Sequence, residues 1–289
     1  MIAVCPNPFR DLDCRITRDI IARLEAAGFK TCVCPLFLEE GAVTLPADMK
    51  ATKLSTVAEN CQMVVVVGGD GTILAAARQL HNTTVPILGV NLGTKGFMTT
   101  LEQDELDQII PAVKGQMSLS CRMKLDVSVI REGKLILEDS ALNDAVMHGY
   151  GDCIKMTVYC NGDRITQFSG DGIILATPTG STGYSMSAGG PIVEPDAENI
   201  IISPICPHST RSSSYVLDPS HVIRVIATDA NRKFVYLSSD GGKAFSLKNE
   251  DVVQASLSKH TMKLVRLSKK SFCEILDKKM AMEAAKYEK

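Results

Sequence analysis

The chain has 289 residues, of which 45% are hydrophobic and 22% are charged, and its formal net charge is −2. This length suits one large domain or two ordinary ones, with enough residues to bury a substantial core. The near-neutral charge argues against a nucleic-acid or membrane surface, no apolar run approaches the ~18 residues that a membrane span needs, and the N-terminus lacks a basic-then-apolar signal segment.

The first third of the sequence alternates predicted strands with predicted helices. Apolar runs predict strands at residues 1–5, 31–34, 63–67 and 85–91. Ile16, Ile20 and Leu24 mark one helical face that Gly28 ends, and further helices are predicted at 72–80 and 102–113, the last one frayed by Pro111. Such alternation predicts a parallel sheet flanked by helices.

After residue 117 the pattern becomes β-rich. Strands are predicted at 125–130, 134–137, 156–160, 173–176, 200–205, 222–227, 233–238 and 262–267, with a helix inserted near 181–188. Asn161-Gly162 is a strong hairpin-turn signal. We therefore expect an α/β domain over residues 1–117 and a β-rich domain over residues 118–269.

The last segment is amphipathic, with apolar side chains at helical spacing at Phe272, Ile275, Leu276, Met280 and Ala284. We expect residues 270–289 to form a helix that returns to the first domain and covers apolar surface there. Full burial of such side chains is worth roughly 1.5–3 kcal/mol each, so we expect deletion of residues 271–289 to leave the protein insoluble or with a much lower melting temperature.

Ten cysteines are scattered along the chain. The closest pair, Cys32 and Cys34, shares one face of a predicted strand, with Cα atoms about 6.6 Å apart, near the far limit for a disulfide. No CxxC motif occurs, and no second close pair completes a metal site. We expect reduced, mostly buried thiols in a cytoplasmic protein.

The strongest motif is the glycine-rich segment that follows the buried strand at 63–67. It reads Gly68-Gly69-Asp70-Gly71-Thr72 and leads into a helix. Glycines there let backbone N–H groups approach phosphate oxygens at the positive end of the helix. Asp70 is out of place among such groups unless it accepts a proton or works with Mg²⁺. The alternative is an Asx turn with a glycine cap.

Two more segments point to ligand binding. Residues 91–97, Asn-Leu-Gly-Thr-Lys-Gly-Phe, follow the next strand, so they lie at the same sheet edge as Asp70, where ligands of open α/β sheets bind. Residues 169–190 contain Ser-Gly-Asp-Gly, a strand, and a stretch rich in Gly, Ser and Thr around Tyr184. Its hydroxyl groups could bind an adenine or ribose, or they could simply cap a helix.

In this order, the segments at 68–72, 91–97, 143–144, 170–172 and 177–184 resemble those of the NAD kinase family. Residues 204–209 and Asp240-Gly241 also resemble family segments. The resemblance implies an N-terminal α/β domain, a β-rich C-terminal domain, and an active site between domains or subunits. It implies transfer of the γ-phosphoryl group of ATP, with Mg²⁺ or another divalent cation, to the 2′-hydroxyl of the adenosine ribose of NAD.

The resemblance also implies residue roles. Asp70 would accept the proton of the ribose hydroxyl, and Gly71 would line the path of the phosphate. Asn143 and Asp144 would hold ribose and diphosphate, and Asp171 would contact the nicotinamide half. The adenine pocket would be shaped by Thr182, Gly183, Tyr184, Ser185, Met186 and Ser187.

The sequence departs from the family pattern at four positions. Asp144 stands where Glu is usual, and Gly183 stands where Ala is usual. Ser169 occupies a position that is commonly basic, and Gly242 one that is frequently Gln. These departures affect the expected affinity and the preference between NAD and NADH, whereas Asp70 is retained.

Two other functions fit parts of the pattern. A sugar or lipid kinase could share the Gly-Gly-Asp-Gly segment, but residues 143–144 and 177–184 argue against it. A non-catalytic dinucleotide sensor could share the fold, but the presence of Asp70 argues against it. The phosphoryl donor stays open between ATP and polyphosphate, and we expect a homodimer or homotetramer because several apolar β segments need covering.

Overall fold

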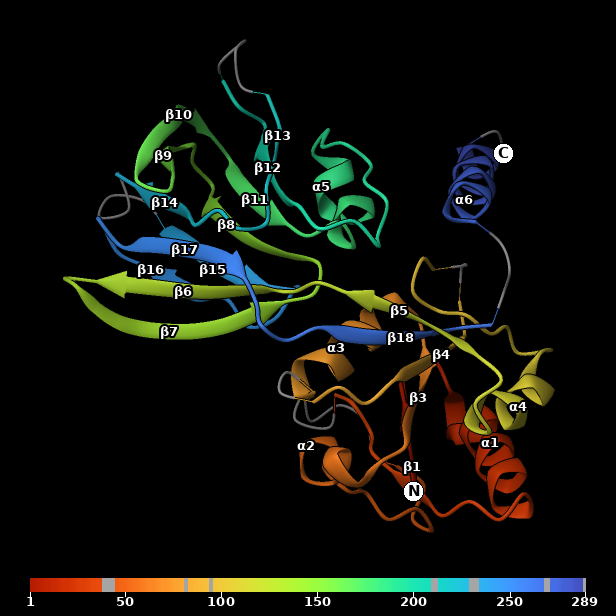
Figure 1. Cartoon of the computed structure of the whole chain (residues 1–289). Coiled ribbons are helices and arrows are strands. Elements are labelled where there is room, and N and C mark those ends of the chain that lie inside the picture. Colours follow the sequence, from red (N-terminus) through yellow and green to blue (C-terminus); the bar gives the residue numbers. More distant parts are fainter. Residues whose placement is uncertain are drawn as a thin grey trace. The chain divides into compact units, whose positions relative to one another are not determined.

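The computed structural model describes residues 1–37, 45–80, 83–93, 96–208, 213–228, 234–267 and 271–287. The chain divides into two compact units (Figure 1). The first comprises Met1–Cys121 together with Met262–Lys289, and the second is Arg122–Thr261. Thr94, Lys95, Ser209 and Lys233, which belong to predicted motifs or strands, lie outside the described residues.

The first unit is built on a six-stranded sheet in the order β2-β1-β3-β4-β18-β5. Its strands are β1 (Ile2–Pro6), β2 (Thr31–Val33), β3 (Met63–Gly68), β4 (Ile87–Asn91), β5 (Ser118–Arg122) and β18 (Met262–Arg266). The strands from β2 to β18 pair in parallel. All six residues of β3 are buried, as expected of an unbroken apolar run covered on both faces.

Helices flank this sheet as the alternation predicts. They are α1 (Arg15–Ala26), α2 (Leu54–Val57), α3 (Asp70–Gln79) and α4 (Ile109–Val113), with 3-10 turns η1 (Leu12–Cys14), η3 (Ala58–Asn60) and η4 (Leu106–Gln108). A further helix of this unit, α6 (Phe272–Tyr287), lies near the C-terminus. Ile20 and Leu24 of α1 pack in the core with β1 and β3, and Gly28 ends the helix at φ +85°. Pro111 lies in the first turn of α4, where a missing N–H is tolerated, so it does not fray the end of a longer helix.

The second unit is a β-sandwich. Its strands are β6 (Leu125–Arg131), β7 (Lys134–Ala141), β8 (Asp144–Tyr150), β9 (Ile154–Cys160), β10 (Asp163–Gly170), β11 (Gly172–Ala176), β12 (Ile200–Ile205), β13 (Tyr215–Leu217), β14 (Ile223–Ala227), β15 (Phe234–Ser239), β16 (Phe245–Leu247) and β17 (Val252–Leu257). They form antiparallel sheets in the orders β10-β9-β14-β17-β6-β7 and β13-β12-β11-β8-β15-β16. Val127 and Val225 of one sheet share a buried cluster with Met147 and Ile173 of the other. The inner faces of the two sheets therefore make the core of this unit.

In the β-rich part, the structure confirms the hairpin turn predicted at Asn161-Gly162 but shows a shorter helix than the one predicted near 181–188. Asn161 and Gly162 both have positive φ (50° and 97°), which confirms the predicted hairpin turn between β9 and β10. The helix predicted near 181–188 is a 3-10 turn η5 (Gly180–Thr182) followed by one helical turn α5 (Tyr184–Ser187).

Strand β18 differs from the sequence-based assignment. The sequence places a strand at 262–267 in the β-rich domain, but in the structure it joins the first sheet, where Leu264 pairs with Ile87 of β4. Strand-forming residues indicate that a segment is extended and partly buried. They do not indicate which sheet it enters.

Helix α6 returns to the first unit, as the sequence predicts. The Phe272 ring lies 6.3 Å from the Phe97 ring, and the Lys279 ammonium lies 3.9 Å from the Phe97 ring centre, within range of a cation–π contact. None of the side chains described on α6, up to residue 281, is buried, and Met280 is 48% exposed. The helix therefore covers less apolar surface than its pattern suggests.

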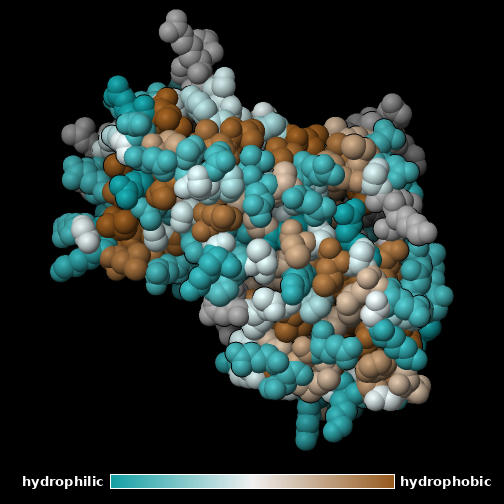
Figure 2. Space-filling view, in the orientation of Figure 1, coloured by the Kyte–Doolittle hydropathy of each residue, from teal (hydrophilic) through white to brown (hydrophobic). Residues whose placement is uncertain are grey.

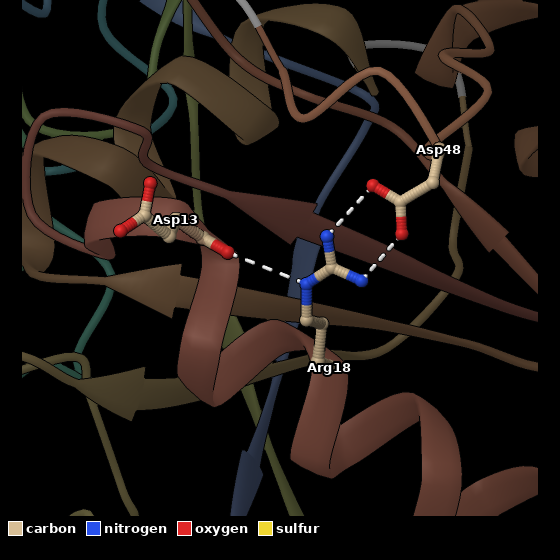
Figure 3. A network of polar contacts seen from close by, with 3 residues as sticks. All are labelled: Asp13, Arg18 and Asp48. Carbon is tan, nitrogen blue, oxygen red and sulfur yellow. Dashed lines mark hydrogen bonds and ion pairs between the residues drawn. The ribbon is translucent and has the colours of Figure 1, made fainter.

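The connection from β1 to α1 is held by polar contacts. The buried Asp11 carboxylate accepts hydrogen bonds from the backbone N–H (2.9 Å) and the hydroxyl (2.6 Å) of Thr17. Figure 3 shows Arg18 donating to the Asp13 carbonyl at 3.4 Å and, through two nitrogens, to Asp48 at 2.6 and 2.8 Å. Each nitrogen of the Arg18 guanidinium therefore donates one hydrogen bond, which ties the start of α1 to Asp48.

Four thiols gather in the first unit, although they are far apart in sequence. The Cys32 and Cys34 sulfurs are 3.9 Å apart, and Cys5 and Cys61 adjoin them. Burial raises the pKa of Cys5 well above its ordinary value and, with the neighbouring Cys34, raises the pKa of Cys32 to about 12. Among the described residues no group of three or more His, Cys, Asp or Glu side chains is arranged to hold a metal ion.

The described surface mixes polar and apolar side chains, as Figure 2 shows for one face. Tyr150 (75% exposed) and Phe234 (67% exposed) are direct cross-strand neighbours on β8 and β15. Within the described ranges, no helix combines the length and the apolar character needed to cross a membrane.

Candidate active site

Asp70 is the first residue of α3 and follows directly on the glycines that end β3. Its carboxylate accepts backbone hydrogen bonds from Phe97 (2.8 Å, to Oδ2) and from Met98 and Thr99 (3.1 and 3.3 Å, to Oδ1). A carboxylate has about four acceptor positions. Three are filled here, so the position that stays open is on Oδ2.

The second glycine motif approaches Asp70 closely. A Cβ atom on Gly96 would overlap Oδ1 of Asp70, so only glycine allows this approach. At the other end of the motif, the Asn91 amide donates to the Gly93 carbonyl (3.2 Å) and to Glu102 (3.0 Å), which shapes the turn after β4. The segments at 68–72 and 91–97, predicted to share a sheet edge, therefore meet at the Asp70 carboxylate.

Thr72 ties this site to the end of β1. Its hydroxyl oxygen accepts hydrogen bonds from the Gly69 N–H (3.2 Å) and from the side-chain amide of Asn7 (3.0 Å). Asn7 follows β1, just as Asp70 follows β3. Gly71 is exposed, and a Cβ atom there would have no neighbour within 4 Å, so the start of α3 is open to a ligand.

In the second unit, Asp240 organises the Asn143-Asp144 pair. Its carboxylate accepts hydrogen bonds from the backbone N–H groups of Leu142 (2.8 Å), Asn143 (2.7 Å) and Asp144 (3.2 Å). Asp240 itself has a positive φ of 49°, a conformation that is unusual for a residue with a side chain. Such strain is maintained where the surroundings require one geometry.

The Asp144 carboxyl group is buried beside a second acid. It is 6% exposed, and its pKa is raised to about 7, first by burial and then by the charge of Asp240. Lys124 is also buried in this unit, and burial lowers its pKa against the opposing effect of Asp240. An acid whose pKa lies near neutrality can both donate and accept a hydrogen bond, which is frequent at functional sites.

Asn143 lies against the segment that contains Tyr184. A Cβ atom on Gly180 would overlap the Asn143 carbonyl, and one on Gly183 would lie 3.4 Å from the Asn143 side-chain nitrogen and 3.9 Å from Oδ2 of Asp144. The side-chain oxygen of Asn143 is buried and accepts no hydrogen bond. An unsatisfied buried acceptor beside two other candidate residues is a position where a ligand hydroxyl or amide would bind favourably.

The glycines on either side of Asp171 are explained by packing. A Cβ atom on Gly172 would overlap the Met147 carbonyl of β8, and one on Gly170 would lie 2.8 Å from the Ile205 carbonyl of β12. Asp171 is half-buried, and its Oδ1 lies 3.8 Å from the Cys153 sulfur. That sulfur is 3.2 Å from Nε2 of His208, so His208 reaches the site through Cys153.

Tyr184 lies in the same neighbourhood as these acids. It is 43% exposed, and its pKa is raised by partial burial and then by Cys206, Asp171 and Asp144. These predicted residues are thus close to one another in the second unit.

Several hydroxyl groups of the same segment serve the fold. Ser185 is buried and hydrogen bonds to Ser203 (2.8 Å), and Ser181 bonds to the Pro178 and Val193 carbonyls (2.7 and 3.1 Å). Thr182 donates to the Thr179 carbonyl at 3.2 Å. Of the six residues predicted for the adenine pocket, Ser187 and Tyr184 are exposed, Thr182, Gly183 and Met186 are half-buried, and Ser185 is turned into the core.

Sequence reasoning did not single out Asp240 or Asn7 as site residues. Each acts on a partner more than sixty positions away, 97 residues in the case of Asp240 and Asn143. The signal available for Asp240 was its place beside Gly241 in a segment that resembles the family. For Asn7 it was an amide at the end of a buried strand.

Family models match most of the chain. A model described as the ATP-NAD kinase N-terminal domain matches residues 22–116, and one described as the ATP-NAD kinase C-terminal domain matches residues 142–267. The chain is 33% identical to the NAD kinase of Acetivibrio thermocellus over 278 residues, which cover 95% of each chain. It is 41% identical to the NAD kinase of Geobacter sulfurreducens over 221 residues, 75% of this chain and 78% of that one.

Solved structures show the same fold. A yeast NADH kinase in complex with NADH superposes with a TM-score of 0.83 at 24% identity, over 96% of this chain and 86% of that chain. An NAD kinase from Archaeoglobus fulgidus in complex with ATP superposes with a TM-score of 0.74 at 25% identity, over 97% and 99%.

Proposed function

Because the chain belongs to the NAD kinase family, we propose that Asp70 is the residue through which it transfers the γ-phosphoryl group of ATP to the 2′-hydroxyl of the adenosine ribose of NAD. The protein is a phosphotransferase whose product is NADP. The observation that supports this role for Asp70 is its carboxylate, which three N–H donors hold at the start of α3 with one acceptor position open on Oδ2.

In this mechanism Asp70 orients the nucleophile and takes its proton. A ribose hydroxyl is a poor nucleophile at neutral pH, so transfer gains from a carboxylate that accepts a hydrogen bond from it. The transition state of phosphoryl transfer is loose, so much of the benefit is positioning, and a carboxylate held by three backbone groups is well suited to that. Exposed Gly71 leaves the start of α3 open to phosphate oxygens.

We assign the binding of NAD to the second unit. The unsatisfied side-chain oxygen of Asn143 can accept a hydrogen bond from a ribose hydroxyl. The Asp144 carboxyl, whose pKa is raised to about 7, can donate one to a ribose hydroxyl or accept one from it. The exposed ring of Tyr184 can stack on the adenine ring, with Gly183 and Thr182 beside it. We assign Asp171 to the nicotinamide half. Ser187 and Met186 complete the segment, whereas Ser185 supports it from inside the fold.

The cation that accompanies ATP binds mainly to the phosphate oxygens in this proposal. Mg²⁺ keeps several water ligands and needs only one or two protein carboxylates when phosphates are present. When bound, the cation neutralises charge that develops on the phosphates.

The experiment is a donor-and-acceptor assay on the purified chain. NADP formation from NAD is followed with an NADP-dependent dehydrogenase, and NADPH formation from NADH by chromatography of the products. Each acceptor is tested with ATP or polyphosphate as donor, with and without Mg²⁺. Turnover of NAD with MgATP supports the proposal. Tight NAD binding without turnover would identify a dinucleotide sensor, and turnover of fructose 6-phosphate or diacylglycerol would identify a different kinase.

We also propose a cytoplasmic homodimer or homotetramer. Ten cysteines with free thiols agree with a reducing compartment. The adjacent exposed rings of Tyr150 and Phe234 offer apolar surface to a second copy. Light scattering at micromolar concentration tests this, and a monomer there would contradict it.

A further inference from the structure

The connection between β1 and α1 carries a guanidinium group that lies against both glycine motifs. A Cβ atom on Gly93 would overlap Nη1 of Arg10, and one on Gly69 would lie 3.4 Å from the same atom. Gly69 belongs to the segment at 68–72, where it directly precedes Asp70, and Gly93 belongs to the segment at 91–97 that follows β4. The absence of side chains at these two glycines is what gives Arg10 its place at the sheet edge.

The position of Arg10 is set by its backbone. The N–H groups of Arg10 and Asp11 both donate to the Asn7 carbonyl, at 3.0 and 2.8 Å, and the Asn7 side chain donates to Thr72 of α3 at 3.0 Å. On its other side the connection is anchored by Asp11 and Thr17. The backbone at Arg10 is therefore held beside the start of α3 by contacts on both sides.

The charge of Arg10 is not neutralised by an acid in the described parts of the chain. Arg18, eight positions on, makes two hydrogen bonds to Asp48, whereas no described carboxylate accepts one from Arg10, which is exposed. A guanidinium presents five N–H donors in a planar fork that matches phosphate oxygens. A cation with free donors, next to glycines at a helix N-terminus, is arranged for an anion with several phosphate oxygens.

We propose that Arg10 binds the phosphate chain of the donor nucleotide and so determines affinity for it. This rests on the proposed kinase function, which supplies a triphosphate as substrate. The alternative source of the same chemistry is the diphosphate of NAD. We favour the donor because Arg10 lies on the glycines next to Asp70, in the first unit, whereas the candidate NAD-binding residues Asn143, Asp144 and Asp171 are in the second.

The kinetic test compares Arg10→Ala, Arg10→Lys and the control Arg15→Ala. Arg15 is also an exposed arginine, at the start of α1, so its removal changes the net charge equally. We expect Arg10→Ala to raise the KM for MgATP about tenfold, the scale of one hydrogen bond between charged groups, with little change in kcat or in the KM for NAD. Arg10→Lys should recover part of the loss because it keeps the charge without the fork, and Arg15→Ala should behave as wild type.

Direct binding separates this proposal from the proposed function. Inorganic tripolyphosphate, titrated calorimetrically into the full chain, should bind wild type and Arg15→Ala more tightly than Arg10→Ala, whether or not the protein makes NADP. Equal binding by all three, or a rise in the KM for NAD instead of the KM for MgATP, would overturn the assignment. If Arg10→Ala melts at a lower temperature than wild type, Arg10→Gln provides the comparison, since it keeps the stem and removes the charge.

Discussion

Replacement of Asp70 by Asn changes the group on which both glycine motifs converge. In the wild type, N–H donors of Phe97, Met98 and Thr99 reach the carboxylate at 2.8, 3.1 and 3.3 Å. An asparagine amide offers one oxygen and one NH₂ group, so its nitrogen must face at least one of these donors. Asp70→Asn therefore loses at least one hydrogen bond to a charged acceptor, a loss of about 1.5–3 kcal/mol.

The effect on catalysis should be larger than the effect on stability. Loss of a general base lowers kcat about 10²–10⁴-fold, which corresponds to roughly 2.7–5.4 kcal/mol of activation free energy. The assay measures kcat from initial rates of NADP formation at saturating MgATP and NAD, the Kd for NAD by calorimetry, and the melting temperature. We expect kcat to fall within that range, the melting temperature to fall by several degrees, and the Kd for NAD to change little.

Gly96→Ala is the matched control because it disturbs the same contact and keeps the carboxylate. Its Cβ atom would overlap Oδ1 of Asp70, so it should also lower the melting temperature, with a smaller loss of kcat. If Asp70 only holds the 96–99 segment in place, the two variants will lose stability and activity in parallel. Retention of more than about a tenth of kcat in Asp70→Asn would refute the base assignment, and Asp144 or Asp171 would become the candidate.

Three further perturbations test the rest of the site. Tyr184→Ala should raise the KM for NAD about two- to tenfold, as expected for one aromatic contact, and lower kcat less. Tyr159→Ala, which removes a partly exposed tyrosine of β9 outside the candidate site, should leave both unchanged. An unchanged KM for Tyr184→Ala would place the adenine elsewhere. The pKa of Asp144 is about 7 in the folded protein, so between pH 4 and pH 7 the folded state keeps a proton that the unfolded state has lost. The contribution of Asp144 to the free energy of unfolding should therefore fall, by on the order of 4 kcal/mol, as pH rises through this window. Asp144→Asn should lack that component in parallel melting curves, and identical pH profiles would contradict the raised pKa. Deletion of residues 271–289 should leave a soluble protein whose melting temperature falls only modestly, because no described side chain of α6 is buried. Its kcat should fall because the contacts of α6 to Phe97 are lost. An insoluble product would show that the helix covers more apolar surface than the structure indicates.

The sequence was sufficient where the physical cause is local. Four valines before a glycine pair indicate a strand buried on both faces that ends in a tight turn, and β3 and α3 have that form. Asn161-Gly162 determines a hairpin turn because both residues tolerate positive φ. The same local logic identified Asp70 and the glycines around it as a phosphate-transfer segment before any tertiary contact was known.

Only the tertiary structure decided what these residues contact. The donors that hold Asp70 are 27–29 positions away, Asp240 reaches Asn143 across 97, and β18 enters the first sheet from beyond the whole β-rich unit. The hydroxyl-rich segment shows the same limit, since nothing in its composition separates Ser185, which bonds to Ser203 in the core, from exposed Ser187. Backbone conformation follows from neighbouring residues through sterics and periodicity, whereas side-chain partners follow from how distant segments pack, and that packing has no signature in the local sequence.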